Sequence, residues 1–505
     1  MKTIKYISII ISVLVISSCK KFLEENPTGS LTPESNVTSP EIARAFANSA
    51  YSQLTTLDEG SGGYGGNTAE LMEFMTGTAD GNAQTEAFRF YDLTYDAESF
   101  YIDTWWQGMY YGIANCNLAL QKIGEITTID EAEKTNMLAE VHTLRALYYF
   151  YLVRMFGDVP KITTVVSDLD SVRPARAPVK EIYDDIIIPD LLLAEQSTLS
   201  WQDNTGLVSM GGIKSLLADV YLTYAGYPVQ GGDQYYAESA KRSKEVIDNG
   251  GYNLFPQYTD MINPANKNKD EFIWQVQFAA GINDNDLTAK TLALYKRISV
   301  YSDEFGGLVP TKQFVESYPD GDKRAEEKQF FYTWYPGNPN NFPPGDPRLD
   351  SVNLGGYYLY KYFDVQAVTS TAHSDLNFTI YRLADIMLMY AEASNHTEHG
   401  PNADATAYVN AIRARATMPP IGTLSETDFE KEVWTQRYLE LCYENKVWFD
   451  MLRTRKVRND ITKNFDDFIG HTTVWGKTFT EKQLLFPIPQ REINNNTNLT
   501  QNPGF

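Results

Sequence analysis

Apolar residues recur at three- and four-residue steps over several long stretches, which is the spacing of one face of an α-helix. The first stretch, residues 40–57, follows Ser39-Pro40, a pair typical of a helix start. Residues 102–125 and 131–156 predict two neighbouring helices, and Gly157 is expected to end the second. The same periodicity predicts further helices at residues 179–196, 211–226, 234–249, 380–395, 403–416 and 426–453.

The middle of the chain, residues 252–380, has a different pattern, and we refer to it as the loop-rich segment. Two short β-prone pieces, residues 272–278 and 357–363, lie among clusters of Gly, Pro, Asn and Asp that predict long loops. Long loops in a compact protein are commonly functional, which draws attention to residues 280–376. The whole pattern predicts a mainly α fold, a TPR-like antiparallel helical stack with a large loop-rich segment carrying short strands.

The first 18 residues resemble a secretory signal rather than a membrane span. Lys2 and Lys5 precede an apolar run that falls well short of the roughly 20 residues a membrane-spanning helix needs. Cys19 stands where an ordinary signal has a small residue, a pattern that looks like a bacterial lipobox. We therefore expect a lipoprotein signal peptide at 1–18, lipidation of Cys19 and a tether over 19–39. The alternative is an ordinary secreted protein with a chance cysteine.

The charge of the chain argues against a nucleic-acid partner, and the cysteine and acidic residues bear on disulfides and metal ions. The 505 residues include 65 acidic and 43 basic ones, a net charge of −22, and such a surface would repel nucleic acid. Cys116 and Cys442 lie in apolar helical patterns and are expected to be buried free thiols, with a disulfide as the alternative in an exported protein. No cofactor is expected. Residues 283–286, Asn-Asp-Asn-Asp, offer oxygen ligands of the type Ca²⁺ prefers, but solvated turn residues are the favoured interpretation.

Several segments, taken in order, resemble the SusD/RagB family of surface lipoproteins from Bacteroidetes. The opening after Cys19 is similar to the family's, and the pattern W-x3-Y-x2-I-x3-N of one family helix is matched by Trp106, Tyr110, Ile113 and Asn117. The other similar stretches are residues 140–150 running on to 156–160, then 318–324, 381–393, 437–441, 448–453, 487–489 and 501–505. One departure is Gln436 before Arg437, where the family usually has a Glu-Arg pair.

The resemblance implies a non-catalytic protein at the cell surface, anchored to the outer membrane by lipid. Such a protein binds a glycan and delivers it to a SusC-like TonB-dependent transporter. The expected unit then spans residues 40–505, with an N-terminal helical part (40–251), the loop-rich segment on the ligand side (252–380), and C-terminal helices with a tail (381–505).

The charged residues within these motifs are expected to have structural roles rather than to bind a ligand. Arg145, Arg382, Glu440 and Asp450 are charges inside largely apolar patterns. A buried charge is costly unless it is paired, so these residues are expected to form internal ion pairs and caps.

A glycan site needs flat aromatic faces for the C–H surface of sugar rings and polar groups for the hydroxyls. The dense aromatic run at 330–335, followed at once by loop residues, makes Trp334, Tyr335 and Tyr332 candidates for stacking. Trp105 is a further candidate, because it should point about 100° away from the packed Trp106 on a helix. The remaining candidates are Tyr301 for stacking and, for polar contacts, Asp80 and Asn82.

Two other functions stay open. A glycosidase would need two carboxylates across a cleft, and 65 acidic residues offer pairs without deciding anything. A transporter lid for a peptide or another non-carbohydrate nutrient is the stronger alternative. Coplanar exposed rings would favour a glycan, whereas a closed polar pocket would favour a peptide or a small solute.

Overall fold

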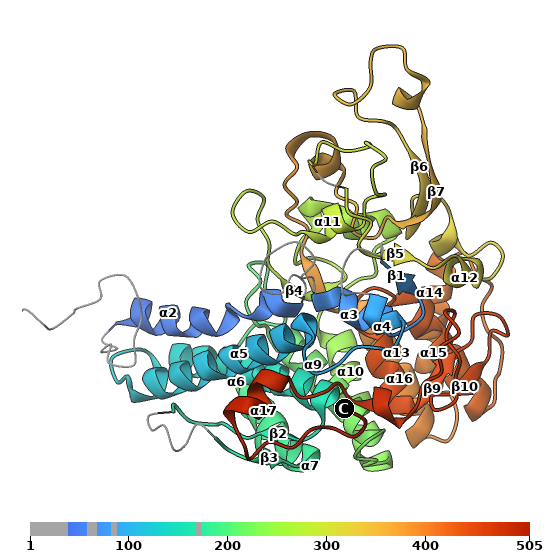
Figure 1. Ribbon diagram of the computed structural model, residues 1–505. Coiled ribbons are helices and arrows are strands. Elements are labelled where there is room, and N and C mark those ends of the chain that lie inside the picture. Colours follow the sequence, from blue (N-terminus) through green and yellow to red (C-terminus); the bar gives the residue numbers. More distant parts are fainter. Residues whose placement is uncertain (1–38, 58–67, 82–87, 167–172, 303) are drawn as a thin grey trace, which may run out of the picture.

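The computed structural model describes residues 39–57, 68–81, 88–166, 173–302 and 304–505 (Figure 1). Helices fill the lower body of the molecule in this view, and most of the loop-rich segment rises above them. The prediction of a mainly α protein with short strands is confirmed. The α-helices are α2 (Pro40–Tyr51), α3 (Thr68–Phe74), α4 (Phe88–Tyr91), α5 (Phe100–Glu125), α6 (Glu131–Phe156), α7 (Val179–Ile182), α8 (Ile188–Ala194), α9 (Met210–Ala225), α10 (Asp233–Asn249), α11 (Leu287–Lys290), α12 (Lys312–Glu316), α13 (Leu383–Thr397), α14 (Ala403–Arg415), α15 (Glu426–Glu440), α16 (Val447–Thr454) and α17 (Gln490–Asn495).

The ends of the long helices follow the local sequence signals. Ser39 caps α2 by accepting a hydrogen bond from a backbone N–H of the first turn at 3.4 Å. The carboxylate of Asp130 accepts two such bonds at the start of α6, at 2.9 and 3.2 Å. Gly157 ends α6 with a φ of 72°, a backbone conformation that suits glycine. The predicted helix at 131–156 is therefore confirmed at both ends.

Neighbouring helices pack in pairs. Helix α5 packs against both α2 and α6, α9 packs against α10, and α10 packs against α13. Helices α5 and α6 approach each other closely at Gly112, where a Cβ atom would lie 2.5 Å from the ring of Tyr148. A glycine is therefore needed at this crossing. Whether the pairs follow a TPR-like regularity stays a prediction.

The strands that the structure describes form two-stranded antiparallel pairs, namely β1–β5, β2–β3, β4–β8, β6–β7 and β9–β10. The pair β4–β8 lies where the loop-rich segment meets the helical body. The pair β6–β7 rises above the body at the upper right of the view (Figure 1). The strands are β1 (Ala79–Asp80), β2 (Val159–Pro160), β3 (Arg176–Ala177), β4 (Phe272–Val276), β5 (Val309–Pro310), β6 (Phe331–Tyr335), β7 (Val352–Leu359), β8 (Phe378–Arg382), β9 (Lys456–Arg458) and β10 (Phe465–Asp467).

The single helix expected over residues 426–453 is wrong, because the chain breaks between α15 and α16. Tyr443 and Asn445 adopt positive φ angles of 63° and 56° in the break. The break turns Asn445 toward α3, where its backbone N–H donates to the Glu73 carboxylate at 3.0 Å. Tertiary hydrogen bonds thus override the helical periodicity at this point.

The charges expected inside the protein are paired. Arg145 contacts Asp190 at 2.7 Å, and Asp450 contacts Arg437 at 2.7 Å. Arg382 contacts both Glu271 and Glu440, at 2.7 and 2.9 Å. The prediction of internal ion pairs is confirmed.

The two thiols that the structure describes, Cys116 and Cys442, are free and buried, as predicted. Burial raises the pKa of Cys442 to about 11, so this thiol stays protonated at neutral pH.

The predicted signal peptide and Cys19 lie outside the described residues, as does most of the tether. Within the described ranges, none of the helices is both long enough and apolar enough to cross a membrane.

Candidate functional site

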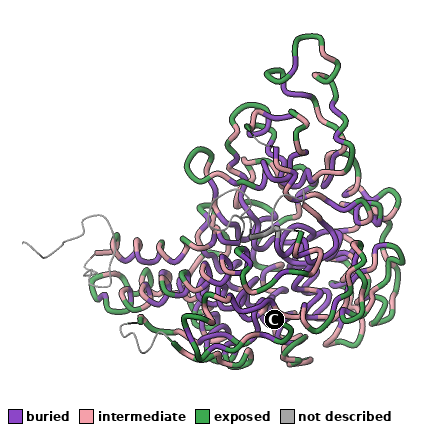
Figure 2. The backbone as a smooth tube through the Cα atoms, in the orientation of Figure 1, coloured by how far each residue is buried: buried purple, intermediate pink, exposed green. Residues whose placement is uncertain are grey.

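The loop-rich segment contains a hydrophobic cluster of its own, which we term the upper cluster, separate from the main core. Buried positions continue into the upper part of the molecule, while its outermost loops are mostly exposed (Figure 2). Tyr301, Tyr335 and Tyr358 pack at the edge of the upper cluster. Its buried members are Leu292, Ala293, Ile298, Tyr332, Phe342, Val352, Leu354, Tyr360, Phe363 and Val368.

Two of the aromatic candidates reach the surface beside this cluster. Trp334 on β6 is 40% exposed, and the Nζ atom of Lys328 lies 3.4 Å from the centre of its ring. Tyr335 is half-buried and packs against Phe363, with ring centres 4.7 Å apart. Trp334 therefore offers an accessible aromatic surface beside a cation, whereas Tyr335 packs against the upper cluster.

Tyr332 is not a surface residue, which corrects the prediction that it stacks on a ligand. It is fully buried, and its ring contacts Tyr358, Tyr360 and Phe363. The sequence favoured an exposed loop here, whereas residues 331–335 form β6 and turn Tyr332 into the upper cluster.

Trp105 is also buried, which corrects its assignment as a ligand residue. Its exposed fraction is 0%, and its ring lies 5.3 Å from that of Tyr151 on α6. The neighbouring Trp106 is buried as well, against Phe156. Helix α5 is covered by α2 and by α6, so positions 100° apart both face protein and neither tryptophan is left for a ligand.

The other candidates lie near the upper cluster. Tyr301 is half-buried at its edge, and within the described residues its hydroxyl has no hydrogen-bond partner. Burial, with the nearby charge of Asp364, raises the pKa of Tyr301. Asp80 on β1 is half-buried, and desolvation raises its pKa to about 6. Burial, together with the charge of Asp80, raises the pKa of Tyr358, which links this carboxyl to the upper cluster. Asn82 lies outside the described residues.

An exposed aromatic residue that the sequence reasoning missed is Tyr295. It is 76% exposed and has a φ of 56°, which is rare for a tyrosine. The next residue, Lys296, donates to the backbone carbonyl of Asn353 on β7 at 3.4 Å, and Asn353 is the strand partner of Trp334. Tyr295 therefore lies on a loop that contacts the strand beside Trp334. The sequence does contain a signal for this exposure. Tyr295 is followed by two basic residues, and the surrounding stretch has neither the helical nor the strand periodicity of a buried element.

A buried carboxylate holds this loop in place. Glu304 accepts hydrogen bonds from the backbone N–H groups of Arg297, Ile298 and Ser299, at 2.6, 2.7 and 2.9 Å. Arg297 also has a positive φ, of 60°. Three bonds to one carboxylate compensate for the unusual backbone, so the loop presents Tyr295 in a defined conformation.

Side chains within residues 283–286, considered above as oxygen ligands for Ca²⁺, make hydrogen bonds and an ion pair within the protein. Asp284 accepts from the Gly281 N–H at 2.5 Å and pairs with His373 at 2.5 Å. Asn285 is buried and donates to the Leu376 carbonyl at 2.8 Å. Within the part of the chain that the structure describes, no group of three or more His, Cys, Asp or Glu residues could hold a metal ion.

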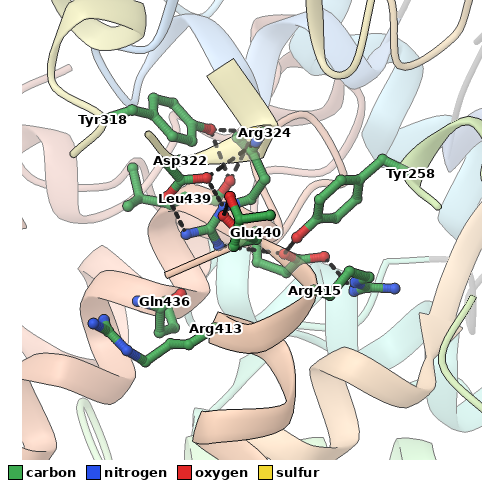
Figure 3. Close-up of polar contacts among 12 residues, drawn as sticks. Tyr258, Tyr318, Asp322, Arg324, Arg413, Arg415, Gln436, Leu439 and Glu440 are labelled. Atoms are coloured by element: carbon green, nitrogen blue, oxygen red, sulfur yellow. Dashed lines mark hydrogen bonds and ion pairs between the residues drawn. The ribbon is translucent and has the colours of Figure 1, made fainter. Parts of the chain in front are cut away.

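A buried ion-pair network fastens the loop-rich segment to the helices. Figure 3 shows Arg324, Arg415 and Tyr258 pointing at the carboxylate of Glu440, at the end of α15. The distances from Glu440 are 3.3 Å to Arg324, 2.7 Å to Arg415 and 3.2 Å to the Tyr258 hydroxyl. Tyr258 and Arg324 belong to the loop-rich segment, so one carboxylate joins two distant parts of it to the helical body.

The charge state of this network follows from its composition. Burial alone would raise the pKa of Glu440, but the guanidinium groups of Arg415, Arg382 and Arg324 hold it well below its usual value. Asp322 makes a second bond to Arg324 at 2.7 Å, so this guanidinium has two carboxylate partners. Glu440 is therefore ionised at neutral pH and joins the loop-rich segment to the helices through buried ion pairs.

Two family models match the chain. The model described as "SusD family" matches residues 345–505, and the model described as "Starch-binding associating with outer membrane" matches residues 21–205. The two matched ranges include most of the helical body and leave out most of the loop-rich segment.

Similar proteins cover nearly the whole chain. A SusD superfamily protein from Parabacteroides distasonis, solved by crystallography, is 55% identical over 93% of this chain and 100% of its own, with a TM-score of 0.91. SusD-like protein P2 from Formosa agariphila is 26% identical and covers 99% of each chain. Surface glycan-binding protein A from Bacteroides uniformis shares the fold, with a TM-score of 0.73 at 20% identity over 92% of this chain and 99% of its own.

Proposed function

The chain belongs to the SusD family, and on that premise we propose that it binds a glycan at the cell surface. The bound glycan passes to a SusC-like TonB-dependent outer-membrane transporter, and the protein itself is non-catalytic. The observation that carries this proposal is the exposure of two aromatic rings, Trp334 and Tyr295, on neighbouring parts of the loop-rich segment. Two relatives support the ligand class by name: a starch-binding family model matches residues 21–205, and one structural neighbour is a glycan-binding protein.

The roles of the individual residues follow from their surroundings. Trp334 and Tyr295 stack on the C–H faces of sugar rings, because both offer a flat ring to solvent. Tyr335, half-buried and 5.3 Å from the Lys328 ammonium, adds a second ring for stacking. The unpartnered hydroxyl of Tyr301, together with Asp80 and Asn82, provides hydrogen bonds to sugar hydroxyls.

The N-terminus supplies the attachment. Residues 1–18 act as a lipoprotein signal peptide, and Cys19 becomes the lipidated first residue of the mature protein. Residues 19–39 then tether the folded unit to the outer membrane. Acyl chains contribute roughly 0.8 kcal/mol per buried methylene, so two or three chains anchor the protein stably.

Affinity gel electrophoresis of the full-length protein in detergent, over a panel of polysaccharides, tests the proposal. We expect one class of polysaccharide to retard the protein and Trp334→Ala or Tyr295→Ala to abolish the retardation. Tyr111→Ala is the matched control, since Tyr111 is 60% exposed on α5, away from the loop-rich segment. Absence of binding to every glycan, or retardation that survives both substitutions, contradicts the proposal. Peptides that co-purify with the protein would then favour the transporter-lid alternative.

A further inference from the structure

Three basic residues belong to the segments that carry the exposed rings. Lys296 and Arg297 directly follow Tyr295, and Lys328 lies against Trp334. Within the described residues, no carboxylate oxygen lies within 4.0 Å of the charged nitrogens of these three side chains. Many other lysines are paired: Lys161, for example, contacts both Glu181 and Asp185. Unpaired cations at this place are notable because the chain carries a net charge of −22.

Nearby carboxylates are engaged elsewhere. Glu304 is buried and accepts from backbone N–H groups, as described above. Glu327, the residue before Lys328, accepts from the backbone N–H and the hydroxyl of Thr333, at 3.0 and 2.9 Å. Asp346 pairs with Arg348 at 2.7 Å. These three carboxylates therefore leave the cations at the aromatic surface without a partner.

The position of Lys328 is specific. Its Nζ atom lies 3.4 Å from the centre of the Trp334 ring and 5.3 Å from that of Tyr335. Its φ of 62° holds the backbone in a conformation that few lysines adopt. Desolvation lowers the pKa of Lys328, and the charge of Glu327 offsets this only in part, since among the described residues no carboxylate lies within 4.0 Å of the ammonium group. Its position places a positive charge beside any sugar that stacks on the indole.

We propose that the glycan bound at Trp334 and Tyr295 is acidic, and that Lys328, Lys296 and Arg297 bind its carboxylate or sulfate groups. This inference rests on the proposed function, because it names the chemical class of the same ligand. An ammonium group acts as a point charge for either anion, and a guanidinium group can bind a carboxylate or sulfate through two parallel hydrogen bonds. Bound anions supply carboxylate or sulfate partners that the described part of the chain does not provide.

The test compares two pairs of polymers that differ only in charge: polygalacturonate with its methyl ester, and dextran sulfate with dextran. Full-length protein in detergent is titrated with each polymer by calorimetry. We expect at least tenfold tighter binding to the charged member of one pair, which identifies carboxylate or sulfate as the group recognised. Hydrogen bonds to charged groups contribute about 1.5–3 kcal/mol, and about 1.4 kcal/mol corresponds to tenfold.

Variants localise the effect. Lys328→Met and Lys296→Met should each weaken binding of the charged polymer about tenfold, while Lys241→Met, at an exposed position of α10, should leave it unchanged. Lys296→Met keeps the test valid if Lys328→Met fails to fold, which circular dichroism checks. Equal binding of charged and neutral polymers, or binding insensitive to both substitutions, overturns the inference and leaves the proposed function standing. Absence of binding to these polymers and to the whole glycan panel contradicts both.

Discussion

Two tryptophans represent the extremes of side-chain environment in this protein. Trp105 is fully buried beside Tyr151, and Trp334 is 40% exposed under a lysine. Burial of a large aromatic side chain removes its whole apolar surface from water, whereas a surface ring contributes little to the free energy of folding. The two residues therefore separate stability from ligand binding.

Replacement of each tryptophan should show this separation. Trp105→Ala is expected to lower the free energy of unfolding by about 3–5 kcal/mol, because it leaves a large cavity between α5 and α6. Trp334→Ala should lower it by less than about 1 kcal/mol while removing glycan binding. Urea unfolding followed by circular dichroism measures both. A Trp105→Ala protein as stable as the wild type would contradict the packing described for α5.

At the scale of elements, α5 and α6 approach each other closely at Gly112. The Tyr148 ring that fills the space there is itself fixed, since its hydroxyl donates to the Ala50 carbonyl of α2 at 2.7 Å. Three helices thus meet through one ring and one glycine. A side chain at position 112 would have to move Tyr148 and break this bond.

Glycine-to-alanine substitutions at two positions of α5 test this contact. Alanine is the better helix former by about 1 kcal/mol, so Gly124→Ala, where a Cβ meets nothing within 4 Å, should be neutral or stabilising. Gly112→Ala should instead destabilise the protein by about 1–3 kcal/mol through overpacking. Thermal unfolding of the two variants gives the comparison. A melting temperature for Gly112→Ala at or above that of Gly124→Ala would contradict the prediction, because it would mean that Tyr148 moves aside without loss of stability.

At the scale of the whole molecule, the Glu440 network joins the loop-rich segment to the helices. Tyr258 lies 182 residues and Arg324 lies 116 residues before Glu440 in the sequence. The folded-state pKa of Glu440 lies below its unfolded value, so its contribution is complete above the ordinary glutamate pKa. The contribution is lost as the pH falls from there through the folded-state pKa.

The variant Glu440→Gln should therefore be destabilised by about 3–5 kcal/mol at pH 7, because three buried guanidinium groups lose a charged partner. The difference from wild type should start to shrink as the pH falls below about 4.5, because Glu440 then takes up a proton in the unfolded wild-type chain while it stays ionised in the folded protein. Denaturant unfolding at pH 7, 5 and 3.5 measures the trend. Glu326→Gln, at an exposed position, is the control. A difference that stays constant over this range would contradict the charge assignment.

Periodicity and family motifs predicted the helical body well, since amphipathic spacing, caps and stop signals such as Gly157 are local. The failures have tertiary causes. Trp105 could not be distinguished from a surface residue without knowing that α2 and α6 cover both sides of α5. Tyr332 required the pairing of β6 with β7, and Tyr295 required the contact of its loop with Glu304. The first two depend on residues far along the chain, and the third on a buried carboxylate whose contacts no periodic pattern reveals.

The separation of the upper cluster from the main core has an evolutionary consequence. Trp334 lies beside the upper cluster, while the helices are held by the main core, which also includes Phe330 and Phe331. Mutations of exposed residues such as Trp334 and Tyr295 can therefore accumulate at little cost to the helices, whereas mutations of Phe330 or Phe331 cannot. Substitutions at exposed positions of the loop-rich segment can thus change the ligand that is bound while the helical body stays folded.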